Sequence, residues 1–498
     1  MGIIQKDALR TTILSYFGIG IGTLNRAVLF LICLSTEQIG LVNLIVAVGL
    51  LFAQMANFGS VASILKFFPY FKNEEKRHHG FISLMLIYVG IGILTCSFAF
   101  YLFKPFIESF YLERSPLFIS FYNWILPIGI SYVFFQFFDA HLRSLHRNIL
   151  SVFIFEVFLR LLVTGLLLLV YFKIISFETF VIMNSLIYAV PTLILFVYML
   201  KIGELNMRSE KVLISNKYRK IVLQYASYNY LNNLGTILVT TLDIMMIAKM
   251  IGLSETGVYS TVYFLVSATL IPFKSIIKIS SPIVAEQWKY RKMNEMEELY
   301  KKVSSVSLLI GIFFFLTIWL NIDFLFAIPG KAFTNGIWVF FFLMIGRLTD
   351  MYCGINGLIF LTSKKYKFEL FFTVFMILAV YFLNLWLIPK FGMTGAAIST
   401  AFAIILYNLG RVFFIYQVYR IHPFKLSQLK LILLGFLTLI LGKSFCYLFP
   451  IGIYGVVLIS LTVFLFYLLP IYLFKIEEEI VNYFNKVISQ LKMRVIKY

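Results

Sequence analysis

Charged residues are scarce in this chain, and their scarcity excludes an ordinary soluble globular protein. Only 13% of the 498 residues are Asp, Glu, Lys or Arg, whereas 61% are apolar, and the mean hydropathy is +0.91. Soluble domains carry about 25% charged and about 45–50% apolar residues. No polar stretch is long enough to form a separate soluble domain. The composition therefore predicts a polytopic membrane protein.

Cysteines and the common catalytic motifs are also sparse. The four cysteines, Cys33, Cys96, Cys353 and Cys446, lie in apolar stretches without a CxxC pair, which indicates free buried thiols. The chain has no Walker loop, GxGxxG fingerprint, HExxH or nucleophile-elbow context. We therefore expect no enzyme, no catalytic residue, no cofactor and no metal.

Histidines give no metal signal either. His141 and His146 flank Arg143 in a predicted inner loop and lack the spacing of zinc ligands. His78 and His79 also fall in a predicted loop. We expect all four side chains to be solvated.

Acidic residues are outnumbered by basic ones, 23 to 43, which gives a formal net charge of +20. In a soluble chain this balance would suggest nucleic acid as a partner. Here the basic residues are spread over the connections between apolar runs and do not gather on one hydrophilic surface. The pattern excludes nucleic acid and indicates the lipid bilayer.

Apolar runs of about 20 residues, the length that crosses ~30 Å of hydrocarbon, recur along the whole chain. The first run lacks a small-residue cleavage site, so we interpret it as a membrane span and not as a signal peptide. Fourteen transmembrane helices are predicted, near residues 11–34, 38–64, 80–103, 117–138, 148–172, 177–200, 221–249, 255–283, 303–327, 334–362, 368–388, 393–419, 430–449 and 451–474.

Lys and Arg in the connections set the predicted orientation. With the N-terminus inside, the inner segments carry 30 of the 43 basic residues and the outer loops carry 7, and the alternation holds at every loop. We therefore expect both termini to be cytoplasmic. Most of the basic excess is then a signal of topology and not a binding site.

The predicted fold class is an all-α polytopic membrane protein with two pseudo-symmetric six-helix lobes and a C-terminal helix pair. The longest inner connection follows the sixth span and suits a hinge, and apolar residues at helical spacing predict an amphipathic helix in the tail. The predicted parts are an N-terminal lobe at 1–200, a cytoplasmic connection at 201–220, a C-terminal lobe at 221–419, an additional helix pair at 420–474 and a cytoplasmic tail at 475–498.

An internal repeat fits this division. A shift of 217 residues aligns Gly18 with Gly235, Thr23 with Thr240 and Gly40 with Gly257, and places Arg26 on Asp243. These identities do not exceed chance in so biased a composition. The layout is more informative, because each set of six spans opens with a helix that carries one deep charge.

Nine charged residues fall deep inside the predicted spans, where each costs roughly 2.5–3.5 kcal/mol to insert. The cations are Arg26, Arg160, Lys274, Lys278, Arg347 and Arg411, and the acids are Glu156, Asp243 and Asp350. We predict that the cations line a substrate-binding cavity that attracts anionic groups and repels cationic ones. The acids are predicted to be charge partners or coupling groups.

Some of these charges have a structural interpretation that stays open. Glu156 and Arg160 are four residues apart on one helical face, and Arg347 and Asp350 are three apart, so each pair can neutralise itself. Arg411 lies close enough to the cytoplasmic end of its span to reach the interface.

Lys274 and Lys278 form the sharpest signal. They project from one helix face four residues apart, where like charges repel, so an anion such as a phosphate, or water, is expected beside them. Pro272 predicts a local helix break next to them, and the alternative for Lys278 is an approach to the inner interface. Arg26 has no acid at helical spacing, which favours a cavity role, with pairing to Asp243 as the alternative.

Three short motifs carry a resemblance to a known family. They are Leu387-Ile-Pro-Lys-Phe-Gly-Met-Thr-Gly-Ala-Ala-Ile-Ser-Thr400, then Ser254-Glu-Thr-Gly-Val-Tyr-Ser260 with its first-half counterpart Thr36-Glu-Gln-Ile-Gly-Leu41, and Ser281-Pro282 before a basic connection. With the 6+6+2 arrangement, the chain resembles the Wzx-type lipid-linked oligosaccharide flippases of the multidrug/oligosaccharidyl-lipid/polysaccharide exporter (MOP) superfamily.

The resemblance implies alternating access that moves an undecaprenyl-diphosphate-linked oligosaccharide across the bacterial cytoplasmic (inner) membrane. The cargo would be an O-antigen unit for lipopolysaccharide, or a capsule or exopolysaccharide repeat unit, and polysaccharide polymerase machinery would be a further partner. The alternatives are a peptidoglycan-precursor flippase, a multidrug/cation antiporter of the same superfamily, and a polysaccharide polymerase or ligase, for which the large outer loop is lacking.

Overall fold

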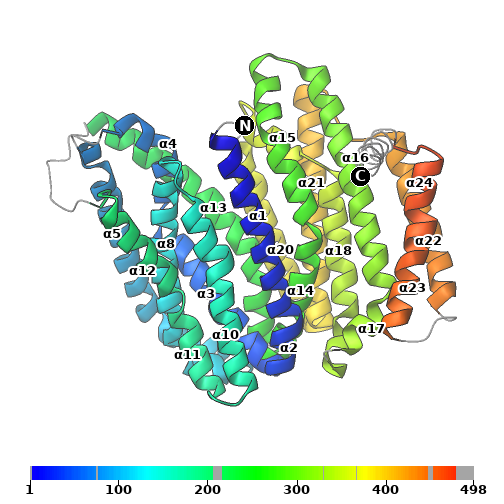
Figure 1. Cartoon of the computed structure of the whole chain (residues 1–498), viewed down its shortest axis with the longest axis horizontal. Coiled ribbons are helices and arrows are strands. Elements are labelled where there is room, and N and C mark those ends of the chain that lie inside the picture. The colour runs from blue at the N-terminus through cyan, green and yellow to red at the C-terminus, as the bar shows by residue number, and fades with distance from the viewer. Residues whose placement is uncertain are drawn as a thin grey trace, which may run out of the picture. The chain divides into compact units, whose positions relative to one another are not determined.

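The computed structural model describes residues 3–73, 77–205, 216–328, 330–365, 367–446 and 452–477, and within these ranges every regular element is a helix (Figure 1). Thirteen helices in this part of the chain are long and apolar enough to cross a membrane, and one bent pair brings the number of candidate spans to fourteen. The predicted all-α polytopic fold is confirmed. Residues 206–215 of the predicted connection and 478–498 of the predicted tail lie outside the described residues.

The chain forms two compact units, Met1–Thr261 (unit 1) and Val262–Tyr498 (unit 2). The finer division at 1–200, 201–220, 221–419, 420–474 and 475–498 stays a prediction. Unit 1 contains α1 (Ile3–Leu24), η1 (Asn25–Leu29), α2 (Phe30–Cys33), α3 (Thr36–Ala56), α4 (Ser60–Phe71), η2 (Arg77–Gly80), α5 (Phe81–Leu102), α6 (Lys104–Tyr111), α7 (Pro116–Ser120), η3 (Tyr122–Trp124), α8 (Ile125–Ser144), α9 (Ile149–Val152), η4 (Phe153–Phe158), α10 (Leu159–Tyr171), α11 (Phe177–Leu186), α12 (Ala189–Lys201) and α13 (Asn216–Met250), and α14 (Leu253–Thr269) crosses its boundary.

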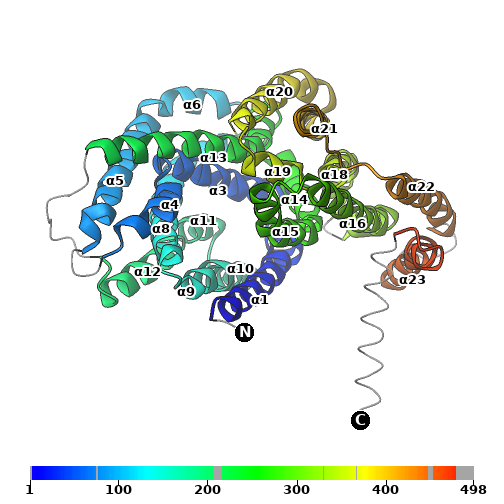
Figure 2. The same ribbon diagram turned by 90° about the horizontal axis from the view of Figure 1, so that it is seen from above.

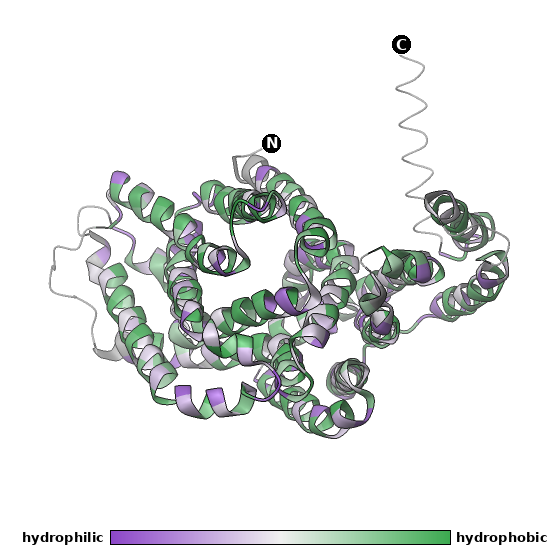
Figure 3. Cartoon of the chain, turned by 90° about the horizontal axis from the view of Figure 1, so that it is seen from below, coloured by the Kyte–Doolittle hydropathy of each residue, from purple (hydrophilic) through white to green (hydrophobic). Residues whose placement is uncertain are grey.

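Unit 2 continues with the helices that carry most of the predicted cations. They are α15 (Ile271–Lys289), α16 (Met293–Leu320), α17 (Ile322–Ala327), η5 (Lys331–Gly336), α18 (Ile337–Tyr352), α19 (Asn356–Thr362), α20 (Phe368–Phe391), α21 (Met393–Tyr419), α22 (Leu426–Cys446), α23 (Ile453–Val463), η6 (Phe464–Leu468) and α24 (Leu469–Leu473). Helix α22 packs on α16 and on α23, so the predicted C-terminal pair lies against α16 (Figure 2). Apolar residues dominate the helices, as expected in a bilayer (Figure 3).

Helix α3 is the central helix of unit 1. It packs on α8 and α13. In its most apolar stretch 78% of the residues are buried, against 17% in the first span, Arg10–Cys33. A capping box fixes its start, because Ser35 Oγ accepts from Gln38 N and Gln38 Oε1 accepts from Ser35 N. The chain can therefore turn sharply into the helix without leaving its first amide groups unpaired.

The predicted span 38–64 is wrong at its end, because α3 stops at Ala56. Phe58 and Gly59 take left-handed conformations, with φ of 47° and 79°, and Asn57 Oδ1 accepts from Gly59 N at 2.7 Å. The chain then restarts as α4. Apolar composition continues through this break, so hydropathy alone does not reveal it.

Pro272 marks a break that the sequence predicts correctly. Helices α14 and α15 meet at Leu270 with a bend of 46°, and Pro272 occupies the first turn of α15. Proline is tolerated there because the first amides of a helix have no partner within it. The two helices together are long and apolar enough to be one broken membrane span.

The motif between α20 and α21 is a tight helical joint. Gly392 has φ of 60° and is the only residue between the two helices. A Cβ at Gly395 would collide with the backbone oxygen of Leu387, so this position accepts only glycine at the present helix spacing. The joint sets α20 and α21 side by side as an antiparallel hairpin.

The paired motifs at 36–41 and 254–260 meet in unit 1. A Cβ on Gly40 would collide with the backbone oxygen of Leu253, and a Cβ on Gly257 would collide with that of Thr36. Each glycine thus faces the residue four positions before the other. The contact has local two-fold symmetry, as expected for pseudo-symmetric lobes.

A side-chain hydrogen bond joins another pair of residues with the same sequence separation as Gly40 and Gly257. Asn43 Nδ2 donates to Ser260 Oγ at 2.9 Å across a separation of 217 residues, which is the shift predicted for the repeat. The register therefore holds beyond the two glycines.

Candidate functional site

Arg26 and Arg160 lie in one polar cluster of unit 1. Asn25 Nδ2 donates to the Arg160 backbone oxygen at 2.9 Å, and Thr164 Oγ1 donates to Asn25 Oδ1 at 2.7 Å. Tyr188 and Arg160 both act electrostatically on Arg26. The structure therefore brings the two predicted arginines of this unit together.

Two π-helical segments shape this cluster. Arg26 lies in η1, and Glu156 lies in η4, which packs on α1. A Cβ at Gly18 would collide with the Glu156 backbone oxygen, and a Cβ at Gly22 would lie 3.2 Å from Arg160 Cδ. The glycines thus let α1 approach the charged helix, and π-helical turns are frequent at functional sites.

The alternative interpretation of Arg160 is confirmed as an ion pair. Arg160 Nη2 lies 2.5 Å from Glu156 Oε2, and the two side chains are 28% and 30% exposed. Asp243 on α13 accepts a hydrogen bond from the hydroxyl of Tyr259, a partner that the sequence analysis did not identify.

Lys274 and Lys278 are both exposed on α15, as the spacing predicts. Neither lysine has a carboxylate within ion-pair distance among the residues that the structure describes. The charged group that acts on Lys274 is Arg347, another cation. Unit 2 therefore holds three positive groups in one region.

Arg347 is itself anchored in a polar network. Its Nη1 lies 3.0 Å from Asp350 Oδ2, and its Nη2 donates to Tyr263 Oη at 3.1 Å. Asn408 Nδ2 donates to Asp350 Oδ1 at 2.6 Å, and Asn356 Nδ2 donates to Asn408 Oδ1 at 2.8 Å. The predicted pairing of Arg347 with Asp350 is confirmed, and the Asp350 carboxylate also accepts from Asn408.

Arg411 has a partner that the sequence analysis missed. Its guanidinium binds Glu369, with Nε 3.1 Å from Oε2, and the two side chains are only 11% and 4% exposed. Tyr407 Oη donates to Glu369 Oε1 at 2.8 Å. Arg411 thus ends in a buried ion pair within the α20–α21 hairpin.

His141 corrects the expectation of a solvated loop. Its side chain is 0% exposed at the end of α8, and His141 Nε2 and His78 Nε2 each lie 3.0 Å from Glu204 Oε2. Burial opposes the charge on Glu204, but the two histidine hydrogen bonds outweigh it and lower the pKa of this carboxyl to about 2. No group of three His, Cys, Asp or Glu in the described part of the chain suits a metal ion.

Comparison with known proteins adds information on the fold. No family model matches the chain. An uncharacterised membrane protein of Methanocaldococcus jannaschii is 24% identical over 408 residues, which cover 77% of this chain and 78% of that protein.

Solved structures match over most of the chain. The lipid II flippase MurJ in an inward closed conformation superposes with a TM-score of 0.73 at 15% identity, covering 93% of this chain and 98% of MurJ. An inward-facing multidrug resistance MATE family transporter of the MOP superfamily superposes with a TM-score of 0.61 at 13% identity, and the match covers 80% of this chain and 94% of that transporter. A MOP superfamily transporter from Pyrococcus furiosus superposes with a TM-score of 0.55 at 14% identity, and the match covers 84% of this chain and 96% of that transporter. This chain therefore has the fold of the MOP-superfamily flippases and transporters.

Proposed function

We propose that the chain is a flippase that moves an undecaprenyl-diphosphate-linked oligosaccharide, such as an O-antigen or capsule repeat unit, across the cytoplasmic membrane by alternating access. The observation that carries the proposal is the exposed pair Lys274 and Lys278, which has no carboxylate within ion-pair distance in the described part of the chain, while the cation Arg347 acts on Lys274. Such a group of cations binds an anion with more than one charge, and a diphosphate meets that requirement.

The substrate divides into parts that suit different surroundings. The diphosphate binds the cations of α15, the glycan lies in water, and the polyprenyl tail stays in lipid, because each buried CH₂ contributes about 0.8 kcal/mol. Arg26 is a second anion contact, and Arg160, Arg347 and Arg411 contribute less because Glu156, Asp350 and Glu369 offset their charge. The chain needs no nucleophile for this task.

The proposed setting is a bacterial cytoplasmic membrane with both termini in the cytoplasm. The distribution of Lys and Arg supports this orientation. The likeness to flippases and transporters supports a transport role in place of an enzymatic one.

Reconstituted protein tests the proposal. The full chain is placed in vesicles with a fluorescent undecaprenyl-diphosphate oligosaccharide, and the fraction accessible to an external lectin is followed over time. We expect Lys274→Ala and Lys278→Ala to slow translocation by about 10–100-fold, the range of a lost charge-assisted bond of roughly 1.5–3 kcal/mol. Lys289→Ala, at the far end of the same helix, is the matched control. Translocation at the wild-type rate by both variants contradicts the site.

A peptidoglycan-precursor flippase is the second candidate. It is favoured by the superposition on MurJ, whose substrate is lipid II. The same vesicles loaded with lipid II decide between the two cargoes. A multidrug antiporter for cationic drugs is disfavoured by the lysine pair, which repels cations.

A further inference from the structure

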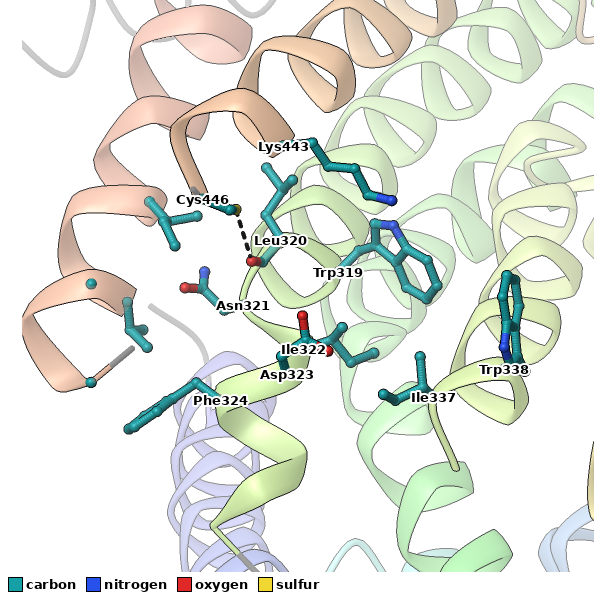
Figure 4. Close-up of a pocket in the computed structure, with 14 residues that line it drawn as sticks. Trp319, Leu320, Asn321, Ile322, Asp323, Phe324, Ile337, Trp338, Lys443 and Cys446 are labelled. Carbon is teal, nitrogen blue, oxygen red and sulfur yellow. Dashed lines mark hydrogen bonds between the residues drawn. The ribbon is translucent and has the colours of Figure 1, made fainter. Parts of the chain in front are cut away.

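Unit 2 contains a pocket that the transport site does not use. It has a volume of about 470 Å³ and lies where α16, α17, α18, α22 and α23 approach one another (Figure 4). Its walls combine two indole rings, Trp319 and Trp338, with three polar groups, Asn321, Asp323 and Lys443.

Asn321 provides the observation that points to a ligand. The residue is 3% exposed and lines the pocket, and its Nδ2 donates to the Thr317 oxygen at 2.8 Å. Its Oδ1 is buried without a hydrogen-bond partner among the described residues. Since buried acceptors are nearly always paired, this oxygen lacks a partner that a hydroxyl group in the pocket supplies once the Asn321 side chain tilts toward it.

The two tryptophans supply flat apolar faces. Their ring centroids are 6.1 Å apart with 59° between the planes, and Trp338 is 56% exposed. The face of an indole ring carries partial negative charge and attracts the weakly positive C–H groups of a ring laid over it. Trp338 lines the pocket and has more than half of its surface exposed, so part of its ring is available to a ligand that is flat and carries C–H groups on one side.

The charged side chains of the pocket, Asp323 and Lys443, favour a ligand that carries hydroxyl groups. Asp323 accepts hydrogen bonds and Lys443 donates them, and both are exposed at the pocket. Hydroxyl groups match all three polar residues, because each can donate to Asn321 and Asp323 and accept from Lys443. A pyranose ring combines such hydroxyls with an apolar C–H face.

The pocket lies at the weakly basic end of unit 2. Helix α16 runs to it from the basic segment 289–302, and α22 runs to it from the basic segment 420–430. The opposite end, at the pocket, has only scattered lysines such as Lys443. The positive-inside rule places this end outside the cell.

We propose that this pocket binds a pyranose unit of the glycan on the outer side of the membrane. This inference rests on the proposed function, which supplies the cargo. It adds a second contact to that cargo, made to an uncharged sugar and not to the diphosphate. Sugar binding there holds the translocated headgroup outside and so opposes its return.

Binding is tested with single sugars and the full chain in phosphatidylglycerol nanodiscs. Methyl glycosides of glucose, N-acetylglucosamine, galactose and rhamnose are titrated up to about 50 mM, because one small ring is expected to bind only weakly. Tryptophan fluorescence and saturation-transfer NMR report binding. We expect at least one glycoside to give a saturable response that is lost in Trp338→Ala and weakened about tenfold in Asp323→Asn.

Trp386→Ala is the matched control. Trp386 is 59% exposed on α20 in the same unit and stacks under Lys390, with 4.3 Å between Nζ and the ring centroid, but it lies outside the pocket lining. Its removal is expected to leave the response unchanged. Both test residues are exposed, so their variants should fold as the wild type does.

Two results overturn the proposal. One is no response to any glycoside, or a response that survives Trp338→Ala and Asp323→Asn. The other is a Trp338-dependent response to phosphatidylethanolamine in the nanodisc with none to sugars, which assigns the pocket to a lipid headgroup. Glycan translocation without sugar binding removes only this inference, whereas sugar binding without translocation removes only the proposed function.

Discussion

Helix α15 and the α20–α21 hairpin both place cations inside membrane spans of unit 2, but they leave them in different states. Arg411 of the hairpin is buried against Glu369 and Tyr407, so its charge is offset. Lys274 and Lys278 of α15 are exposed, and the charged neighbour acting on Lys274 is a cation. These cations therefore differ in their partners although all lie within membrane spans, and we expect the partner to decide the role.

The largest expected effect comes from breaking the hairpin pair. Glu369→Ala leaves Arg411 buried without its ion-pair partner, which costs about 3–5 kcal/mol. Thermal unfolding of the purified protein should therefore shift to a markedly lower temperature.

A double variant is the control for this prediction. Glu369→Leu with Arg411→Met removes both charges and should recover most of the lost stability, because apolar residues can replace a buried pair. If translocation also survives in the double variant, Arg411 serves structure alone. If Glu369→Ala unfolds at the wild-type temperature, the pair is not holding the hairpin.

The next test gives Lys274 of α15 an acidic partner, as Arg411 has in the hairpin. Lys278→Glu places an acid four residues after Lys274, so the two side chains can pair. We expect translocation to fall by about 10–100-fold, because Lys274 is then occupied and the diphosphate meets a negative charge. Stability should change by less than about 0.5 kcal/mol. Vesicle transport and unfolding are measured on the same preparation, and unimpaired transport contradicts the comparison.

In unit 1 the opposite substitution, which removes an acid from an existing ion pair, is the test. Glu156→Gln keeps a hydrogen-bonding group but removes the charge that offsets Arg160. Because this pair is partly exposed, stability should change by no more than about 1 kcal/mol. Binding of the diphosphate-linked substrate should become a few-fold tighter, as measured by titration. Weaker binding would show that Glu156 itself contacts the cargo.

The smallest effect near neutral pH is expected at Glu204. A carboxyl whose pKa is lowered from its ordinary value of 4.5 to about 2 contributes its full stability above the ordinary value. This contribution is lost as pH falls from about 4.5 toward about 2. Unfolding temperatures from about pH 6 to about pH 3 should therefore fall more steeply for the wild type than for Glu204→Gln. Parallel curves would mean that the histidine contacts do not hold the carboxylate.

Features encoded locally were predicted well from the sequence. The spans follow from apolar runs, the bend between α14 and α15 follows from Pro272, and the i,i+4 pair of Glu156 with Arg160 follows from helical spacing. Each of these depends on residues that are close together in the sequence. Helix periodicity is sufficient to find them.

Pairings between helices were missed because they depend on packing. Glu369 stands beside a basic connection and looks like an interfacial residue, yet the joint at Gly392 brings it level with Arg411. The two residues are nearly equally far from Gly392 in sequence, which is the signal that could have found the pair. His141 was missed because its partner Glu204 follows the sixth span, and no local pattern joins them.

The contact of Gly40 with Gly257 has a consequence for the origin of the chain. In a self-complementary interface, residue i of one copy meets residue j of the other and j meets i, which is the pattern of these glycines and the backbone of Thr36 and Leu253. A half-length protein with one such helix would present the same surface to a second copy of itself. Backbone contact of this kind leaves no room for a side chain at either glycine. The fusion of two such halves would turn a homodimer interface into a permanent internal one.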